Sequence, residues 1–322
     1  MSPTVSARQI PLSSIQDAAR SVYKAAIRTP LIRVDVDDPR YPVPELYLKL
    51  ETLQPIGSFK IRGAYNVIRQ LTPTALEHGV CTVSAGNAAQ GVALAARLVG
   101  TRATVMVIDT APDTKVQAIE RLGATIIRGS YDECWRAIID RGSLRLPGCF
   151  VHPFDDDRFI AGNATVGLEI LEDLPDVDAI VAPIGGGGLL AGLSAAITPS
   201  RPQARIYAAE PETAAPLARS LDAGRPLFFD GWTASFVDGA GGKSVLETMW
   251  PLLKDLAGSI VVPLADAAAA MRFAATRARV IAEGAAGCAI AGALSGRAGR
   301  GKIVAVVSGG NVDLSRFASL VL

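Results

Sequence analysis

The sequence has 322 residues, of which 49% are hydrophobic and 20% are charged, and its formal net charge is +1. This composition predicts a soluble globular protein with two domains or one large one. The balanced charge, without a basic stripe or acidic tail, argues against nucleic acid and membranes as partners. The four cysteines form no CxxC pair, which favours reduced thiols in a cytoplasmic protein over disulfides or a zinc site.

In chain order, the first 72 residues predict a helix at 14–26, a strand at 46–50 and a helix at 61–71. Strands and helices then alternate: strands at 80–84, 103–108 and 125–128, and helices at 88–99, 114–122 and 131–140. This alternation, with glycines closing the elements, is typical of parallel βαβ units.

A second unit begins near residue 150. Its predicted helices lie at 162–173, 189–197, 213–223, most of 243–256, two Ala-rich stretches divided near Gly284, and 314–321. Its predicted strands lie at 179–184, 205–210, 259–263 and 303–307. The uncharged stretch 179–200 is broken by Pro183 and four glycines, so we do not interpret it as a membrane span.

We therefore predict an α/β fold with two open, twisted sheets. The small domain, residues 73–149, is inserted in a large domain of residues 1–72 and 150–322, with a cleft between them. Ligands of such sheets bind at the carboxyl ends of the strands.

Lys60 lies where a loop that contains Gly57 and Ser58 leads into a helix. A cation in the first turn sits at the positive end of the helix dipole, which lowers its pKa. A lysine with a lowered pKa is suited to Schiff-base chemistry. The alternative is a surface lysine that opens an amphipathic helix, the commoner case for an isolated lysine.

Four glycines, Gly185 to Gly188, follow a Val/Ile-rich strand and open a helix. Converging N–H groups at a helix N-terminus favour an anion, so this segment is predicted to bind phosphate. A mononucleotide-like cofactor and a dinucleotide both remain open. Glu210 lies where a ribose-binding acid would sit, but the GxGxxG spacing is absent.

Two further polar segments follow predicted strands. Ser84-Ala85-Gly86-Asn87 could bind a carboxylate through its N–H groups and the Ser84 hydroxyl, or it could be an ordinary helix cap. Ser308 follows the last strand, and its segment Ser-Gly-Gly-Asn could equally be a simple turn.

Together, four segments resemble the threonine dehydratase and serine racemase family, the pyridoxal-phosphate enzymes of fold type II. They are 58–64 (SFKIRGA), 84–87 (SAGN), 185–188 (GGGG) and 308–311 (SGGN), in the family's order. The resemblance implies pyridoxal 5′-phosphate as cofactor and Lys60 as the catalytic Schiff-base lysine. The other implied cofactor-binding residues are Phe59, Asn87, Gly185, Gly186, Gly187, Gly188, Glu283 and Ser308. Those implied to bind the substrate carboxylate are Ser84, Ala85, Gly86 and Asn87.

The resemblance implies an ammonia-lyase that converts a β-hydroxy amino acid, L-threonine or L-serine first, to a 2-oxo acid and ammonia. Lys60 would take the Cα proton, and the cofactor phosphate would protonate the leaving hydroxyl. Ala85 stands where the racemases have an acid/base serine, so racemisation should be weak. We also expect a homodimer, and no C-terminal regulatory domain or feedback inhibition by isoleucine.

Three positions depart from the family pattern: Ala88 replaces the usual histidine, Asn163 a glutamine, and Pro216 an acid of a metal site near Glu210 and Ala214. No metal is therefore assigned, although a divalent cation stays open. The alternatives are a dehydratase of 3-hydroxyaspartate or of a hydroxyectoine-pathway compound, and a serine racemase. An NAD-dependent dehydrogenase built on Glu210 and a non-catalytic binding protein are further alternatives.

Overall fold

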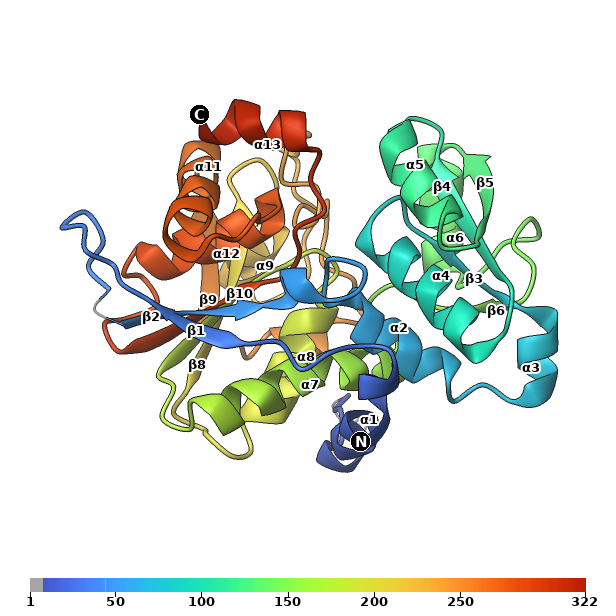
Figure 1. The fold of residues 1–322 in the computed structure, drawn as a ribbon, viewed down its shortest axis with the longest axis horizontal. Helices are drawn as coiled ribbons and strands as arrows, with labels where there is room; N and C mark the ends of the chain where they lie inside the picture. The colour runs from blue at the N-terminus through green and yellow to red at the C-terminus, as the bar shows by residue number, and fades with distance from the viewer. Residues whose placement is uncertain (1–7, 44) are drawn as a thin grey trace.

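The computed structural model describes residues 8–43 and 45–322. Figure 1 shows two α/β lobes, each built on its own sheet, with the segment from α3 to β6 in the smaller lobe and the C-terminal half of the chain in the larger. Two sheets of parallel strands confirm the predicted fold class. No helix in the described ranges is long and apolar enough to cross a bilayer.

The larger sheet has six strands in the order β1-β2-β10-β7-β8-β9, and only β1 runs antiparallel to its neighbour. The strands are β1 (Leu31–Val34), β2 (Glu45–Leu50), β7 (Ala179–Pro183), β8 (Arg205–Pro211), β9 (Gly258–Val262) and β10 (Lys302–Val307). β7 is buried along its whole length, as expected for a parallel strand covered on both faces.

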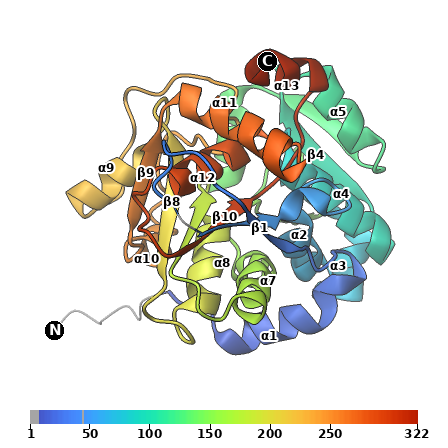
Figure 2. The ribbon, with the colours of Figure 1, turned by 60° about the vertical axis from the view of Figure 1, so that its left-hand side comes forward.

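Helices cover both faces of this sheet (Figure 2). Successive residues of a strand point to opposite faces. Accordingly, Val304 and Val306 of β10 pack in one core with α1, α7 and α8, and Ile303 and Val307 pack in the other with α11 and α12. The bounds are α1 (Leu12–Ser21), α7 (Asp157–Asp173), α8 (Gly188–Ile197), α11 (Leu264–Phe273) and α12 (Gly284–Leu294).

The smaller sheet has four parallel strands in the order β5-β4-β3-β6. They are β3 (Val80–Val83), β4 (Ala103–Ile108), β5 (Thr125–Gly129) and β6 (Cys149–Phe150). The helices of this lobe are α3 (Pro73–His78), α4 (Asn87–Val99), α5 (Asp113–Glu120) and α6 (Tyr131–Ile139). Residues of α4 and α5 pack on one face of the sheet and residues of α6 on the other.

Helix α2 (Lys60–Ile68) lies between the lobes and packs against α4 of the smaller and α7 of the larger. Glycine makes the approach to α7 close, because a Cβ on Gly162 would collide with the backbone of Arg62 and Gly63. The first residue of α2 is therefore held where the two lobes meet.

Several predicted elements differ from the observed ones. The helix predicted over most of 243–256 is wrong, since only α10 (Trp250–Leu253) is helical and Ser244 pairs with Phe228 in an isolated bridge. Helix α9 (Pro216–Ala223) begins at its proline, which suits the first helical turn. Helix α7 begins before residue 162, because the Asp156 carboxylate accepts hydrogen bonds from the N–H groups of Arg158 and Phe159. The last helix, α13 (Leu314–Val321), has the predicted bounds.

Candidate active site

A cleft of about 600 Å³ lies between the two sheets. The carboxyl ends of β3, β7 and β10 lead into it, and so does the N-terminus of α2. All the residues singled out from the sequence as catalytic, cofactor-binding or substrate-binding line this cleft: Phe59, Lys60, Ser84, Ala85, Gly86, Asn87, Gly185, Gly186, Gly187, Gly188, Glu283 and Ser308. Segments far apart in the chain thus share one site, while the role of each residue remains a prediction.

Backbone pairing brings Lys60 next to the turn after β10. The N–H of Phe59 donates to the carbonyl of Ser308 at 3.1 Å, and the N–H of Gly310 donates to the carbonyl of Gly57 at 2.9 Å. Ser58 forms a bridge with Gly309. The start of α2 is therefore attached to the carboxyl end of β10, at the position of Ser308.

The Lys60 side chain lies between aromatic rings and has a perturbed charge. Its Nζ donates to the carbonyl of Pro153 at 2.7 Å and lies 5.3 Å and 5.4 Å from the ring centroids of Phe59 and Phe159. Burial lowers the pKa of Lys60 to about 8, against the opposing charge of Glu283. The lowered pKa agrees with the sequence prediction, but burial rather than the helix dipole is its main cause.

Glu283, Asn87 and Asn311 form a chain of hydrogen bonds across the cleft. The Nδ2 of Asn87 donates to Oε1 and Oε2 of Glu283 at 2.9 Å and 3.1 Å, and the Nδ2 of Asn311 donates to Oδ1 of Asn87 at 2.7 Å. Burial raises the pKa of Glu283 to about 7. Asn311 ends one of the recognised segments but was assigned no role from the sequence. In the structure its hydrogen bond fixes the orientation of the Asn87 amide.

The glycine segment, Gly185 to Gly188, also lines the cleft. Gly187 has φ +91°, a left-handed conformation that favours glycine, and α8 starts at the next residue. The first N–H groups of a helix have no partners within the helix, so this end can receive an anion.

These residues fit pyridoxal phosphate. A buried amine of lowered pKa, a glycine-rich helix N-terminus and a strand-end serine line one cavity, and Glu283 is buried beside them.

Other residues of the cleft were missed from the sequence. Trp135, Tyr131 and Ile138 of α6 line it, and Trp232 and Lys243 come from the loop between α9 and α10. The only available signal was that the chain has just 3 tryptophans; two of them line the cleft.

Glu210 does not fulfil the ribose-binding role considered for it. It lines no part of the cleft, and its carboxylate accepts hydrogen bonds from the N–H groups of Leu217 and Ala218 at 2.8 Å and 2.9 Å, and from the hydroxyl of Ser259 at 2.5 Å. It thus caps α9 and cannot bind a ribose in the cleft. Among the described residues, no group of three or more His, Cys, Asp or Glu side chains could hold a metal.

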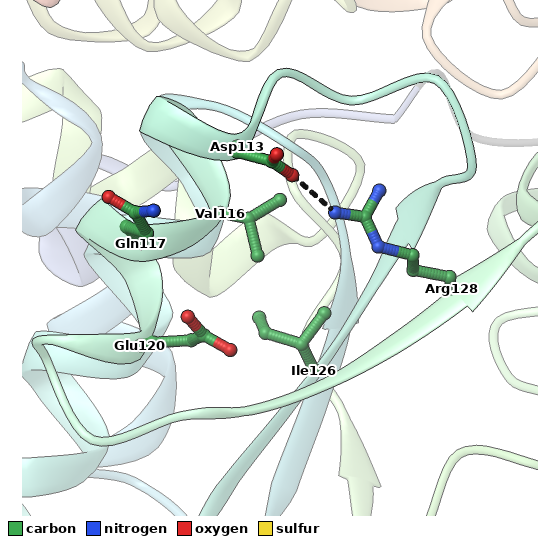
Figure 3. Close-up of a pocket in the computed structure, with 6 residues that line it drawn as sticks. All are labelled: Asp113, Val116, Gln117, Glu120, Ile126 and Arg128. Carbon is green, nitrogen blue, oxygen red and sulfur yellow. Dashed lines mark hydrogen bonds and ion pairs between the residues drawn. The ribbon is translucent and has the colours of Figure 1, made fainter.

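A second hollow, about 420 Å³, lies on the smaller lobe between α5 and β5 (Figure 3). Arg128 and Asp113 form an ion pair of 2.9 Å at its rim. None of the six residues described as lining it also lines the cleft, so it takes no part in the candidate site.

Residues 22–309 match the family model of pyridoxal-phosphate dependent enzymes. An L-threonine ammonia-lyase of Thermotoga maritima is 40% identical over 95% of this chain and 77% of its own length. A catabolic L-threonine dehydratase of Staphylococcus aureus is 36% identical over 97% and 92%. The structure of maize serine racemase, 33% identical, superposes with a TM-score of 0.87 over 97% of this chain and 96% of that one. The chain therefore belongs to the family of pyridoxal-phosphate-dependent enzymes.

Proposed function

We propose that the protein is a pyridoxal-phosphate-dependent ammonia-lyase that converts L-threonine or L-serine to a 2-oxo acid and ammonia. The observation that carries this proposal is the shared cleft, which is lined by Lys60, by a glycine-rich helix N-terminus and by the loop 84–87. Relatives named L-threonine ammonia-lyase and L-threonine dehydratase support the reaction type.

The cofactor, when bound, joins the substrate amine and withdraws electrons from its Cα. In the proposed mechanism, Lys60 holds the cofactor and then, as a free amine, removes the Cα proton. A pKa of about 8 leaves part of the amine uncharged near neutral pH, as a general base requires. The glycine segment would hold the cofactor's phosphate, and the neutral hydroxyl of Ser308 would serve the ring nitrogen without supplying a charge.

The loop 84–87 supplies the other half of the site. The N–H of Ser84 donates to the carbonyl of Met106, and that of Gly86 donates to the Ser84 hydroxyl. The N–H groups of Ala85 and Asn87 and the Ser84 hydroxyl would therefore bind the substrate carboxylate, at the start of α4. Ala85 belongs to the same loop and lines the cleft. Its methyl side chain has no proton to transfer, so no acid at this position can reprotonate Cα from the face opposite Lys60. This favours elimination over racemisation.

Turnover of L-threonine and L-serine, measured as 2-oxo acid released, tests the proposal. We expect activity in the cofactor-loaded protein, and its loss in Lys60→Ala together with the cofactor's absorption near the visible edge. Lys243→Ala is the matched control, since Lys243 lines the same cleft but is not assigned to the chemistry. Full activity in Lys60→Ala would contradict the mechanism.

We further propose that the enzyme is a cytoplasmic homodimer. Its four cysteines are free thiols, and three of them are buried, which suits a reducing compartment. Two apolar side chains, Ile27 and Leu53, are 44% and 51% exposed. Two hydrogen bonds join Ile27 to Gln54, which follows Leu53 in the chain, so we place the dimer contact at these two side chains. Light scattering should show more monomer for Leu53→Asp than for the parent chain. If the parent chain itself has the mass of a monomer, the dimer is refuted.

A further inference from the structure

One wall of the cleft has no part in the proposed mechanism. It runs from the loop 84–87 toward the glycine segment and consists of apolar side chains: Val83, Ile108, Trp135, Ile138 and Phe154. Val83 and Ile138 are 7% and 6% exposed, whereas Trp135 is 37% exposed. The wall is therefore part of the smaller lobe's core at its base, with the indole of Trp135 exposed above it.

The charged side chains of the cleft are already engaged. Apart from Lys60 and Glu283, the charged residues among the described lining are Lys115, Asp238 and Lys243. Lys115 and Asp238 form an ion pair with each other. The Nζ of Lys243 lies 4.2 Å and 4.7 Å from the ring centroids of Tyr131 and Trp232, within the range of a cation–π contact.

A side pocket extends the apolar wall. It has a volume of about 70 Å³ and shares five residues with the cleft: Trp135, Phe154, Gly185, Gly186 and Gly242. Leucine, isoleucine and valine side chains form most of the remainder: Ile184, Val245, Leu246 and Leu253. Since one water molecule needs about 10–15 Å³, this pocket has room for several carbon atoms beyond the main cleft.

We propose that this apolar wall, centred on Trp135, receives the β-substituent of the substrate. The enzyme accepts β-hydroxy amino acids whose β-substituent is a hydrocarbon larger than a methyl group. This inference rests on the proposed function and adds the substrate class. A hydrocarbon gains by leaving water against this wall, whereas the second carboxylate of 3-hydroxyaspartate would lose its hydration against the same apolar side chains.

The first test measures kcat/KM of the holoenzyme for serine, threonine, 3-phenylserine and 3-hydroxyaspartate. One methylene in a hydrophobic pocket changes kcat/KM by roughly 10–200-fold. We expect threonine to exceed serine by about tenfold, 3-phenylserine to equal or exceed threonine, and 3-hydroxyaspartate to fall about a hundredfold below threonine. A preference for 3-hydroxyaspartate over threonine would overturn the inference.

The second test uses variants of Trp135 and compares two substrates in the same protein. Trp135→Ala should lower the ratio of kcat/KM for 3-phenylserine to that for serine by about tenfold, and Trp135→Phe should lie between. The comparison is made only if Trp135→Ala keeps the parent's far-UV circular dichroism and measurable turnover of serine, so that loss of folding is excluded before the ratio is read. Trp250→Phe is the matched control, because the third tryptophan lines neither the cleft nor the side pocket. An unchanged ratio in Trp135→Ala would refute the role of the indole.

A binding measurement separates this inference from the reaction itself. Phenylalanine, 2-aminobutyrate and aspartate lack the hydroxyl that leaves, so their binding does not require elimination. Titrated into the holoenzyme and followed by the cofactor's absorption, phenylalanine should bind at least tenfold tighter than aspartate. Tight phenylalanine binding without turnover of any hydroxy amino acid would reject the ammonia-lyase and keep the apolar site; tighter aspartate binding would reject the apolar site.

Discussion

Substituting Arg62 should destabilise the helix that begins with Lys60. Arg62, Lys49, Glu51 and Glu169 are 0–1% exposed and form a buried cluster. The Arg62 guanidinium donates four hydrogen bonds of 2.6–3.0 Å to the carboxylates of Glu51 and Glu169. Lys49 lies 2.6 Å from Glu169. Two cations therefore face two anions, and the cluster as a whole is neutral.

The magnitude follows from the charge left behind. Arg62→Met leaves Lys49 alone with two buried carboxylates, and breaking a buried pair in this way costs about 3–5 kcal/mol. Adding the four hydrogen bonds at about 1.5–3 kcal/mol each would overshoot, because the folded state has already lost the hydration of these groups. We expect about 4 kcal/mol, which for a chain of 322 residues is a fall in Tm of roughly 6 °C.

Thermal and urea unfolding of the cofactor-free chain at pH 7 measures this loss. The double variant Arg62→Met/Glu51→Gln restores a balanced pair of Lys49 and Glu169, so it should recover about half of the loss. Arg20→Ala is the control, because the side chain of Arg20 is 72% exposed in its pair with Asp17. A double variant no more stable than the single one would refute the explanation by charge and favour lost packing.

The stability lost in Arg62→Met should also depend on pH. Burial by itself raises the pKa of Glu169, but the charges of Arg62 and Lys49 outweigh it, so the pKa lies below the ordinary 4.5. A carboxyl whose pKa is lowered by folding stabilises the protein above its unfolded pKa and loses this effect as the pH falls through the folded pKa. The difference between the parent chain and Arg62→Met should thus be full at pH 7 and shrink below about pH 4.5.

Three further predictions concern Glu283, the Lys115–Asp238 pair and Glu210. The charge of Glu283 raises the pKa of Lys60, so Glu283→Gln should bring the pKa of Lys60 below 8. Reductive trapping of a small aldehyde on Lys60 in the cofactor-free chain should then reach half its maximal rate at a lower pH than in the parent chain. A shift to higher pH would contradict this role of Glu283. The Lys115–Asp238 pair joins the lobes, but its side chains are 34% and 55% exposed. Because an exposed ion pair contributes little, Asp238→Ala should lower kcat/KM by no more than about fivefold, and the charge-exchanged double variant should recover it. A fiftyfold loss would contradict this prediction. Glu210→Ala removes the cap of α9 and should cost about 0.5–2 kcal/mol in urea unfolding, more than Glu210→Gln; equal stability would show that the cap is dispensable.

The sequence was most informative where a regular element meets a loop with an unusual composition. The strand β7, the glycine segment and α8 could be predicted, because a buried parallel strand is apolar throughout. The four glycines then mark where this strand has ended and the next helix begins. The whole segment 224–249 could not be predicted in this way. Apolar residues such as Leu246 and Met249 repeat at helical spacing, yet they pack against the core from a loop.

Contacts between distant segments also escaped prediction. The two hydrogen bonds that link Asn311 to Asn87 and Asn87 to Glu283 join residues that are 224 and 196 positions apart in the sequence. Motifs placed Asn87 and Ser308 in the site, but no local pattern assigns a partner to an amide. Trp135 was missed for the same reason: on α6 it reads as an ordinary apolar helix residue, and only the packing of the two lobes brings it to the cleft.

Helix α2 combines two opposite electrostatic requirements within three residues. Lys60 needs an uncharged form and Arg62 a charged one, and burial alone lowers the pKa of both. Residues two positions apart in a helix point in nearly opposite directions, so Lys60 faces the cleft and Arg62 faces α7. The charge of Glu283 only partly offsets the burial of Lys60, whereas Glu51 and Glu169 more than offset that of Arg62 and raise its pKa. The guanidinium of Arg62 keeps its proton in any case. The carboxylates on each side set the direction of each shift: two of them raise the pKa of Arg62 above its ordinary value, whereas one leaves the pKa of Lys60 below its own.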